Sequence, residues 1–178
     1  GSEMCIRDRY CLRAFQVHRQ VDKIVIVAAH EWQNFIQEWI QKKQIDKFAS
    51  FAIPGKSRQH SILSGLKEAR RIGDEAVDNI IIHDAARPFL SEKMIEDCIN
   101  GLEKYDGILP VLPVKDTMYL SADGFSITSL LNRDHIYIGQ SPESFRLNAY
   151  YKANISTSDE YLNGIRGSSE IAYKAGMS

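Results

Sequence analysis

The chain has 178 residues, of which 44% are hydrophobic and 25% charged, an ordinary globular composition that excludes wholesale disorder. Lys and Arg number 22 and Asp and Glu 23, for a formal net charge of −1, so there is no whole-domain basic field for nucleic acid or anionic membranes. The longest purely apolar run, residues 24–29, is too short to cross a bilayer, and no signal-peptide pattern occurs. We therefore expect a single-domain cytoplasmic protein that binds neither nucleic acid nor membrane.

Several common signatures are missing from the sequence. The three cysteines, Cys5, Cys11 and Cys98, are an odd number without CxxC spacing, which makes buried thiols a simpler interpretation than a disulfide framework or a zinc site. No GxGxxG, Walker A, HExxH or GxSxG motif occurs. Dinucleotide-binding, P-loop, zincin and α/β-hydrolase interpretations therefore lose their usual support.

Both ends of the sequence suggest a cut chain. Gly1-Ser2 is typical of a scar left by tag removal, and residues 4–9 show neither helical nor strand periodicity. At the other end, residues 169–176 predict a short helix with a glycine stop, two residues before the last residue. We expect residues 1–9 to be a tag scar and non-native leader, and residues 10–178 to be a partial domain truncated at both ends.

Strand and helix signals alternate from residue 23 onward. Residues 23–29 are apolar and rich in β-branched side chains, which predicts a strand buried on both faces. Residues 31–43 carry one apolar helical stripe. Residues 48–53 predict a weaker strand, which Pro54-Gly55 ends, and a helix follows with Ile62, Leu63 and Leu66 facing inward.

The strand and helix signals from residue 79 onward predict a sheet from which a hairpin protrudes. Residues 79–83 indicate another buried strand, residues 91–104 an amphipathic helix, and residues 107–114 a strand interrupted by Pro110. Successive βα units predict an α/β fold with a mostly parallel sheet and helices on both faces. Residues 115–140 break this rhythm with a turn between two short extended runs, which predicts a protruding β-hairpin arm.

Three polar clusters follow predicted strands, where parallel α/β sheets bind their ligands. In residues 55–61, a glycine, Arg58, Ser61 and the free N–H groups of a helix start can meet an anion or a base, although a plain turn and cap would look the same. In residues 84–88, Asp84 is suited to Mg²⁺ and Pro88 keeps Arg87 extended; the alternative is a capping Asp and a surface Arg. The third cluster, residues 115–117, 133 and 139–142, consists of ordinary loop residues.

Four segments in order carry a family resemblance: GKSRQHSILSGL (55–66), IIIHDAARPF (80–89), PVKDTM (113–118) and GQSPESF (139–145). Together they resemble the 2-C-methyl-D-erythritol 4-phosphate cytidylyltransferases, from about residue 10 to the end. The resemblance implies a Rossmann-like nucleotidyltransferase fold and transfer of CMP from CTP to that polyol phosphate in the isoprenoid precursor pathway, with release of pyrophosphate. The related ribitol 5-phosphate cytidylyltransferases share the layout, and only DAARP and Asp116-Thr117 favour the erythritol branch.

The resemblance also implies roles for single residues. Gly55 and Ser61 would contact the cytosine, with Arg58 supporting their turn, and Lys56, Asp84 and Ala85 would complete the nucleotide site. Asp84 and Arg87 would be catalytic, with Asp84 holding Mg²⁺ or another divalent cation. Arg87, Thr117, Arg133 and Ser141 would bind the polyol phosphate. In this family the arm of the neighbouring subunit completes that site, so residues 115–140 imply a homodimer.

Two departures from the family pattern bear on activity. Lys56 stands where the family usually has an acidic or small residue, which is harmless if that position acts through its backbone. No Gly-rich segment with an Arg and a Lys for the triphosphate precedes Tyr10, and a later Lys of the family has no counterpart before Ser178. Because catalysis between two anions depends on such cations, we expect no measurable turnover from this chain. Ribitol 5-phosphate as substrate, a noncatalytic dimerising fragment and an unrelated Rossmann-like domain remain open alternatives.

Overall fold

The computed structural model describes the backbone of residues 2–73 and 79–178 and the side chains of residues 9–73 and 79–178. Cys5 and most of the expected leader, residues 1–9, thus have side chains outside the described residues. Helix α1 (Ser2–Val17) starts inside that leader, where the sequence shows no helical pattern. None of the described helices is long and apolar enough to cross a membrane.

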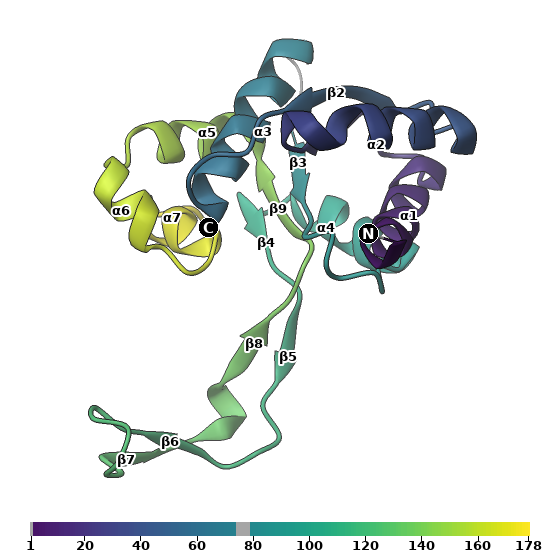
Figure 1. The fold of residues 1–178 in the computed structure, drawn as a ribbon. Coiled ribbons are helices and arrows are strands. Elements are labelled where there is room, and N and C mark those ends of the chain that lie inside the picture. The colour runs from purple at the N-terminus through teal and green to yellow at the C-terminus, as the bar shows by residue number, and fades with distance from the viewer. Residues whose placement is uncertain (1, 74–78) are drawn as a thin grey trace.

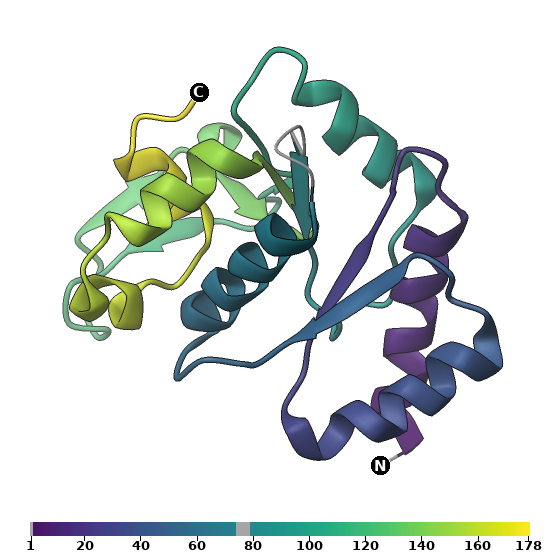
Figure 2. The same cartoon turned by 90° about the horizontal axis from the view of Figure 1, so that it is seen from above.

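Helices and strands follow α1 along the chain (Figures 1 and 2). The first half of the chain contains β1 (Ile24–Val27), α2 (His30–Lys43), β2 (Phe48–Ala52), α3 (Arg58–Ile72), β3 (Asn79–Ile82) and α4 (Glu92–Gly101). The second half contains β4 (Gly107–Ile108), β5 (Val111–Pro113), β6 (Met118–Leu120), β7 (Ser129–Leu131), the 3₁₀ turn η1 (Arg133–His135), β8 (Tyr137–Gly139), β9 (Glu143–Arg146), α5 (Leu147–Ile155), α6 (Asp159–Gly164) and α7 (Ser169–Lys174). The alternating elements predicted between residues 23 and 104 are all present.

The predicted mostly parallel sheet is only partly correct. Strands β1 and β2 pair in parallel, whereas β9 lies between β3 and β4 and runs antiparallel to both. The reason is the path of the chain, because β9 enters the sheet on the return from the arm. Since β3 and β4 both oppose β9, they run in the same direction, as their connection through α4 requires.

Two apolar clusters form the core. Helices α1 and α2 pack on β1 and β2 around Ile24, Ile40 and Ile45. Helix α3 packs against β9, α5 and α7 around the fully buried Leu66 and Phe145. Strand β1 is less buried than predicted: Ile24 is covered but Val27 is 38% exposed, at a strand that pairs only with β2 among the described strands.

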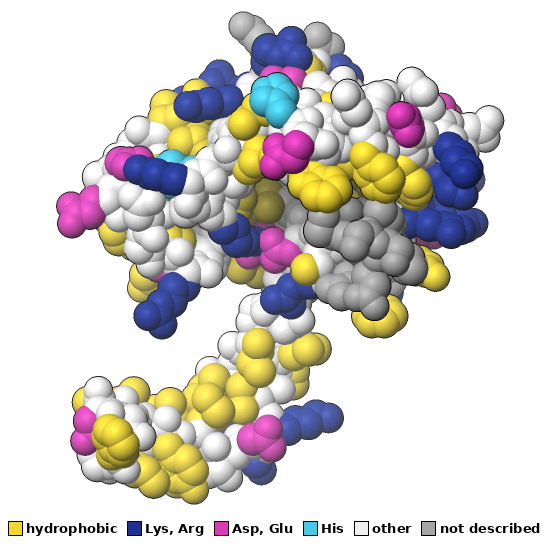
Figure 3. Space-filling view, in the orientation of Figure 1, with side chains coloured by type: hydrophobic (Ala, Val, Ile, Leu, Met, Phe, Trp, Pro, Cys, Tyr) yellow, Lys and Arg dark blue, Asp and Glu magenta, His cyan; other side chains and the backbone are white. Residues whose placement is uncertain are grey.

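The arm, residues 115–140, extends away from the body as predicted (Figure 1). The predicted strand 107–114 divides at Leu109-Pro110 into β4, which stays in the body, and β5, which pairs with β8 at the base of the arm. Beyond that ladder, β6 and β7 form the predicted hairpin. Apolar side chains run along the exposed surface of the arm (Figure 3).

Candidate functional site

The turn between β2 and α3 is shaped by hydrogen bonds among its own residues. Ser57 caps α3, its Oγ accepting from the His60 amide. The Gly55 amide donates to Ser61 Oγ at 3.1 Å, and Ser61 Oγ donates to the Ser57 carbonyl at 3.1 Å. A Cβ at position 55 would lie 2.3 Å from the Cβ of His60, so only glycine fits this close approach. The predicted residues Gly55 and Ser61 therefore meet directly.

Arg58, the first residue of α3, reaches Asp84 in the loop after β3. Its Nε and Nη2 donate to Asp84 Oδ1 at 3.1 and 3.0 Å, and its Nη1 donates to Ser168 Oγ at 2.6 Å. The other carboxylate oxygen, Oδ2, lies 3.8 Å from Arg87 Nε. One carboxylate therefore stands between two guanidinium groups, and its neighbour Ala85 is exposed in the same loop.

Residues 140 and 141, between β8 and β9, form hydrogen bonds with the loop that contains Asp84 and Arg87. Ser141 is buried, and its Oγ accepts from the Asp84 amide at 3.2 Å. Arg87 Nη1 donates to Gln140 Oε1 at 3.1 Å. The Ser141-Pro142 peptide is cis. Three predicted residues, Asp84, Arg87 and Ser141, thus come together although they lie up to 57 positions apart in the chain.

Two further residues of this cluster were not singled out by the sequence. His83 Nδ1 lies 3.0 Å from Ser141 Oγ and its Nε2 lies 3.0 Å from the Arg87 carbonyl; burial lowers the pKa of this imidazole, so the neutral form prevails. Glu143, at the start of β9, has Oε1 3.8 Å from Arg58 Nη2. Within the described part of the chain its Oε2 is buried without a hydrogen-bond partner, and burial raises its pKa. Both residues lie inside the resembling segments. His83 ends the strand predicted to be buried, but no sequence pattern assigns it a role, and neither the type nor the spacing of Glu143 marks it as buried.

Lys56 points to a different partner. Its Nζ forms an ion pair with Asp159, the first residue of α6, whereas Asp84 is engaged by Arg58. The sequence offered no signal for this pairing, because the two residues lie 103 positions apart.

Thr117 and Arg133 lie on the arm and do not meet the other predicted residues within one chain. Both line a shallow hollow of about 440 Å³ together with residues 130–132 and 134. Arg133 Nη1 donates to the Lys115 carbonyl. The strands β6 and β7 that flank these two residues stand far from the body that carries β3 and α3 (Figure 1).

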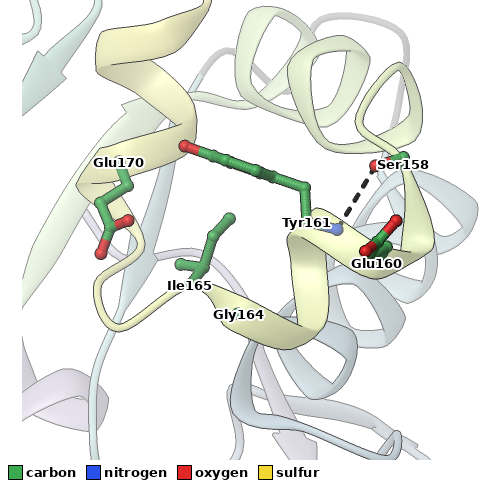
Figure 4. A pocket seen from close by; sticks show the side chains of 6 residues that line it. All are labelled: Ser158, Glu160, Tyr161, Gly164, Ile165 and Glu170. Atoms are coloured by element: carbon green, nitrogen blue, oxygen red, sulfur yellow. Dashed lines mark hydrogen bonds between the residues drawn. The ribbon is translucent and has the colours of Figure 1, made fainter.

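A second hollow, of about 360 Å³, lies on α6 and α7 (Figure 4). Its lining includes Glu160, Tyr161, Ile165 and Glu170, and none of the predicted site residues. The Tyr161 amide in its wall donates to Ser158 Oγ, which caps α6. The predicted chemistry therefore concentrates at the Asp84 loop, away from this hollow.

Comparisons with known proteins bear on the family and the fold of the chain. The sequence model described as IspD, 2-C-methyl-D-erythritol 4-phosphate cytidylyltransferase, matches residues 9–177. A curated enzyme of that name from Clostridium acetobutylicum is 35% identical over 153 residues, which are 85% of this chain and 64% of the relative. The chain thus spans slightly less than two thirds of that relative.

Two further similarities concern a bifunctional relative and the fold. A bifunctional ribulose 5-phosphate reductase/CDP-ribitol pyrophosphorylase from Haemophilus influenzae is 32% identical over 146 residues, which are 81% of this chain and 30% of the relative. The crystal structure of 4-diphosphocytidyl-2C-methyl-D-erythritol synthase from Anaerococcus prevotii superposes with a TM-score of 0.81 at 22% identity, covering 94% of this chain and 71% of that one. The predicted α/β nucleotidyltransferase fold is confirmed.

Proposed function

Because the chain belongs to the 2-C-methyl-D-erythritol 4-phosphate cytidylyltransferase (IspD) family, we propose that its binding sites serve the transfer of CMP from CTP to 2-C-methyl-D-erythritol 4-phosphate. The observation that carries the proposal is the meeting of three motif segments at one residue, Asp84. Arg58 donates to Asp84, and the Asp84 amide donates to Ser141. Such a junction beyond the end of β3 is where α/β sheets bind their ligands.

The chemistry of this transfer suits the residues present. A phosphate oxygen of the polyol bonds to the α-phosphorus of CTP, while the bond from that phosphorus to the β-phosphate oxygen breaks and pyrophosphate leaves with the electron pair. The attacking phosphate monoester has a second pKa of about 6 and is already ionised at neutral pH, so no general base is required. The protein must instead position two anions and offset their charge. Arg58 and Arg87 supply cationic groups on either side of Asp84.

Asp84 is also suited to a divalent cation. Its Oδ1 is occupied by Arg58, but its Oδ2 is 3.8 Å from Arg87 and therefore beyond hydrogen-bond distance. The side chain is 36% exposed, and the described residues contain no cluster of three or more His, Cys, Asp or Glu for a dedicated metal cage. One carboxylate supplemented by water and phosphate oxygens is a typical Mg²⁺ site. When bound, Mg²⁺ would neutralise charge on the phosphates.

The arm supports the proposal of a homodimer. Thr117 and Arg133 are remote from Asp84 within one chain, yet they line a hollow that carries a guanidinium group. Apolar side chains on the same arm are exposed, including Phe125 at 97% and Leu130 at 67%. A neighbouring subunit that covers these side chains would bring Arg133 to the phosphate of the polyol bound near Arg87. We propose a cytoplasmic location, because both substrates are charged phosphates.

A second candidate substrate is ribitol 5-phosphate. It is favoured by the relative named as a CDP-ribitol pyrophosphorylase, whose identity of 32% is close to the 35% of the first relative. Both polyol phosphates present a dianionic phosphate to the same arginines. They differ in the carbon chain and its hydroxyl groups, so the affinity of the protein for each polyol phosphate distinguishes the two candidate substrates.

Calorimetric titration tests the proposal. We expect CTP with Mg²⁺ to bind saturably, and 2-C-methyl-D-erythritol 4-phosphate to bind at least tenfold more tightly than ribitol 5-phosphate. Asp84→Asn should weaken CTP binding by about tenfold or more, since it removes a charged ligand. Asp97→Asn, at an exposed carboxylate paired with Lys93 on α4, is the matched control. Absence of CTP binding, or equal binding by Asp84→Asn, would contradict the proposal; tighter binding of ribitol 5-phosphate would favour the second candidate.

A further inference from the structure

The carboxylate of Asp159, on α6, contacts two residues of the turn of residues 55–61. Asp159 forms an ion pair with Lys56 Nζ and lies with its Oδ1 2.8 Å from His60 Nε2. The other ring nitrogen of His60, Nδ1, is 2.7 Å from Ser57 Oγ. Asp159 therefore contacts the turn directly at Lys56 and His60, and His60 extends the second contact to Ser57.

His60 transmits this contact to the glycine of the turn. The imidazole is mostly enclosed, with 14% of the side chain exposed, and its Cβ occupies the position next to Gly55 that a side chain there would need. Gly55 in turn donates its amide to Ser61. The two residues proposed to contact the cytosine, Gly55 and Ser61, are thus one contact away from a side chain that Asp159 holds.

The charge of Lys56 gives the Asp159 carboxylate a role beside the 55–61 turn. An unpaired ammonium group directly after Gly55 could occupy any of many rotamers beside the ligand. Hydrogen bonds from Lys56 and His60 hold the pKa of Asp159 below its usual range, so its charge is present at neutral pH and balances that of Lys56. The ammonium group is thereby directed to α6, which leaves the backbone of residue 56 for the ligand.

The effect of Asp159 on the stability of the protein should be confined to the 55–61 turn, since exposed ion pairs contribute little to global stability. Lys56 and Asp159 are 54% and 66% exposed at their side chains. By contrast, several contacts on one short loop can restrict that loop's own opening, which is independent of global unfolding. The clamp, as we call Asp159 with Lys56 and His60, therefore acts on the order of the turn.

We propose that Asp159 is a positioning residue for nucleotide binding: through Lys56 and His60 it orders the 55–61 turn before CTP arrives, without touching CTP itself. This inference rests on the proposed function, in which that turn binds the base. It assigns α6, an element outside all four resembling segments, a part in substrate recognition.

Amide hydrogen exchange and CTP titration of the same variants test the clamp. Asp159→Asn keeps the shape of the side chain but removes its charge, and we expect the Gly55, His60 and Ser61 amides to exchange about three- to tenfold faster. The affinity for CTP should fall by a similar factor, while the thermal midpoint changes little. Glu160→Gln, at the neighbouring exposed residue outside the clamp, is the matched control and should behave like the parent chain.

A charge swap separates positioning from a merely structural role. Lys56→Glu alone should accelerate exchange of the same amides, and the double variant Lys56→Glu/Asp159→Lys should recover part of the lost protection and of the lost CTP affinity. If Asp159→Asn leaves both exchange and CTP affinity at parental values, the clamp is wrong. If the parent chain does not bind CTP although exchange responds as expected, the proposed function fails, and the failure lies in the ligand and not in the clamp.

Discussion

Glu143 is a carboxylate that the fold encloses next to Arg58, with 12% of its side chain exposed. Burial raises its pKa from the ordinary value of 4.5, and Arg58 offsets only part of that effect. The folded protein therefore holds a proton on Glu143 at pH values where the unfolded chain has released it. It follows that the contribution of Glu143 to stability decreases as the pH rises from about 4.5 through the raised pKa of the folded state.

Glu143→Gln removes this dependence. We expect the free energy of unfolding of the variant, relative to that of the parent chain, to increase as the pH rises from about 4.5 through the raised pKa of Glu143, and then to level off. Urea titrations at several pH values measure the difference, with Glu96→Gln on the exposed side of α4 as the control for the substitution. A difference that is constant or falls with rising pH would show that Glu143 is not destabilised as an anion.

Arg133 is proposed to bind the phosphate of the polyol, far from the nucleotide. A hydrogen bond between charged groups contributes roughly 1.5–3 kcal/mol, so Arg133→Ala should weaken binding of the polyol phosphate by about 10- to 150-fold and spare CTP. Arg133→Lys should recover only part of the loss, because an ammonium group cannot form a bidentate fork. Calorimetry with each ligand separately checks this; equal losses for both ligands, or none, would make Arg133 a surface residue.

At the residue scale, the sequence predicted which segments meet at the site better than it predicted the individual contacts between their side chains. Asp84 and the 55–61 turn follow strands directly, and the carboxyl ends of parallel strands are expected to lie close together; the two do meet, although β2 and β3 belong to separate sheets among the described strands. Glu143 and Asp159 gave no such signal. A buried carboxylate and an exposed one look alike in sequence, and a contact spanning 103 positions depends on how α6 packs near α3.

At the scale of elements, the helices with long apolar stripes were predicted, whereas α1, α5 and α6 were not. The apolar stripes of α2, α3 and α4 repeat over ten or more residues, and Ser57 and Ser91 cap two of these helices with their side chains. Gly176, at φ +70°, ends α7 as its position predicts.

The strands that were missed or wrongly joined have a common physical reason. β9 has only four residues, of which only Phe145 is apolar, so no alternation of polar and apolar residues marks it as a strand. β4 and β5 appear as one strand in the sequence because apolar residues continue through the break at Pro110. Only the pairing partners distinguish β4 from β5, and partners 24 to 38 positions away leave no local mark in the sequence.

At the scale of the molecule, the exposed apolar side chains of the arm predict self-association. They include Leu120, Phe125, Ile127 and Leu130 on the hairpin and Tyr137 and Ile138 at its base, each at least half exposed in the single chain. Light scattering at micromolar concentration should give the mass of a dimer, since such a contiguous apolar surface is rare on monomers.

Leu130→Asp places a charge in the middle of that surface and should shift the mass towards the monomer. Tyr173→Ser removes an apolar side chain of similar exposure, 88%, from α7, and should leave the dimer intact. A monomeric parent chain, or a dimer that survives Leu130→Asp, would contradict an interface through the arm.

The position of β4 beside β9 has a consequence for how this family can vary. Gly107 and Phe145 are paired neighbours in the sheet, so the chain leaves the body and re-enters it at one point. Closure of a loop depends only weakly on its length, about 0.6 kcal/mol for each doubling. The part of the arm beyond the β5–β8 ladder, residues 114–136, can therefore be lengthened, shortened or exchanged with little penalty to the body. Partner choice and polyol preference can thus evolve independently of the nucleotide site.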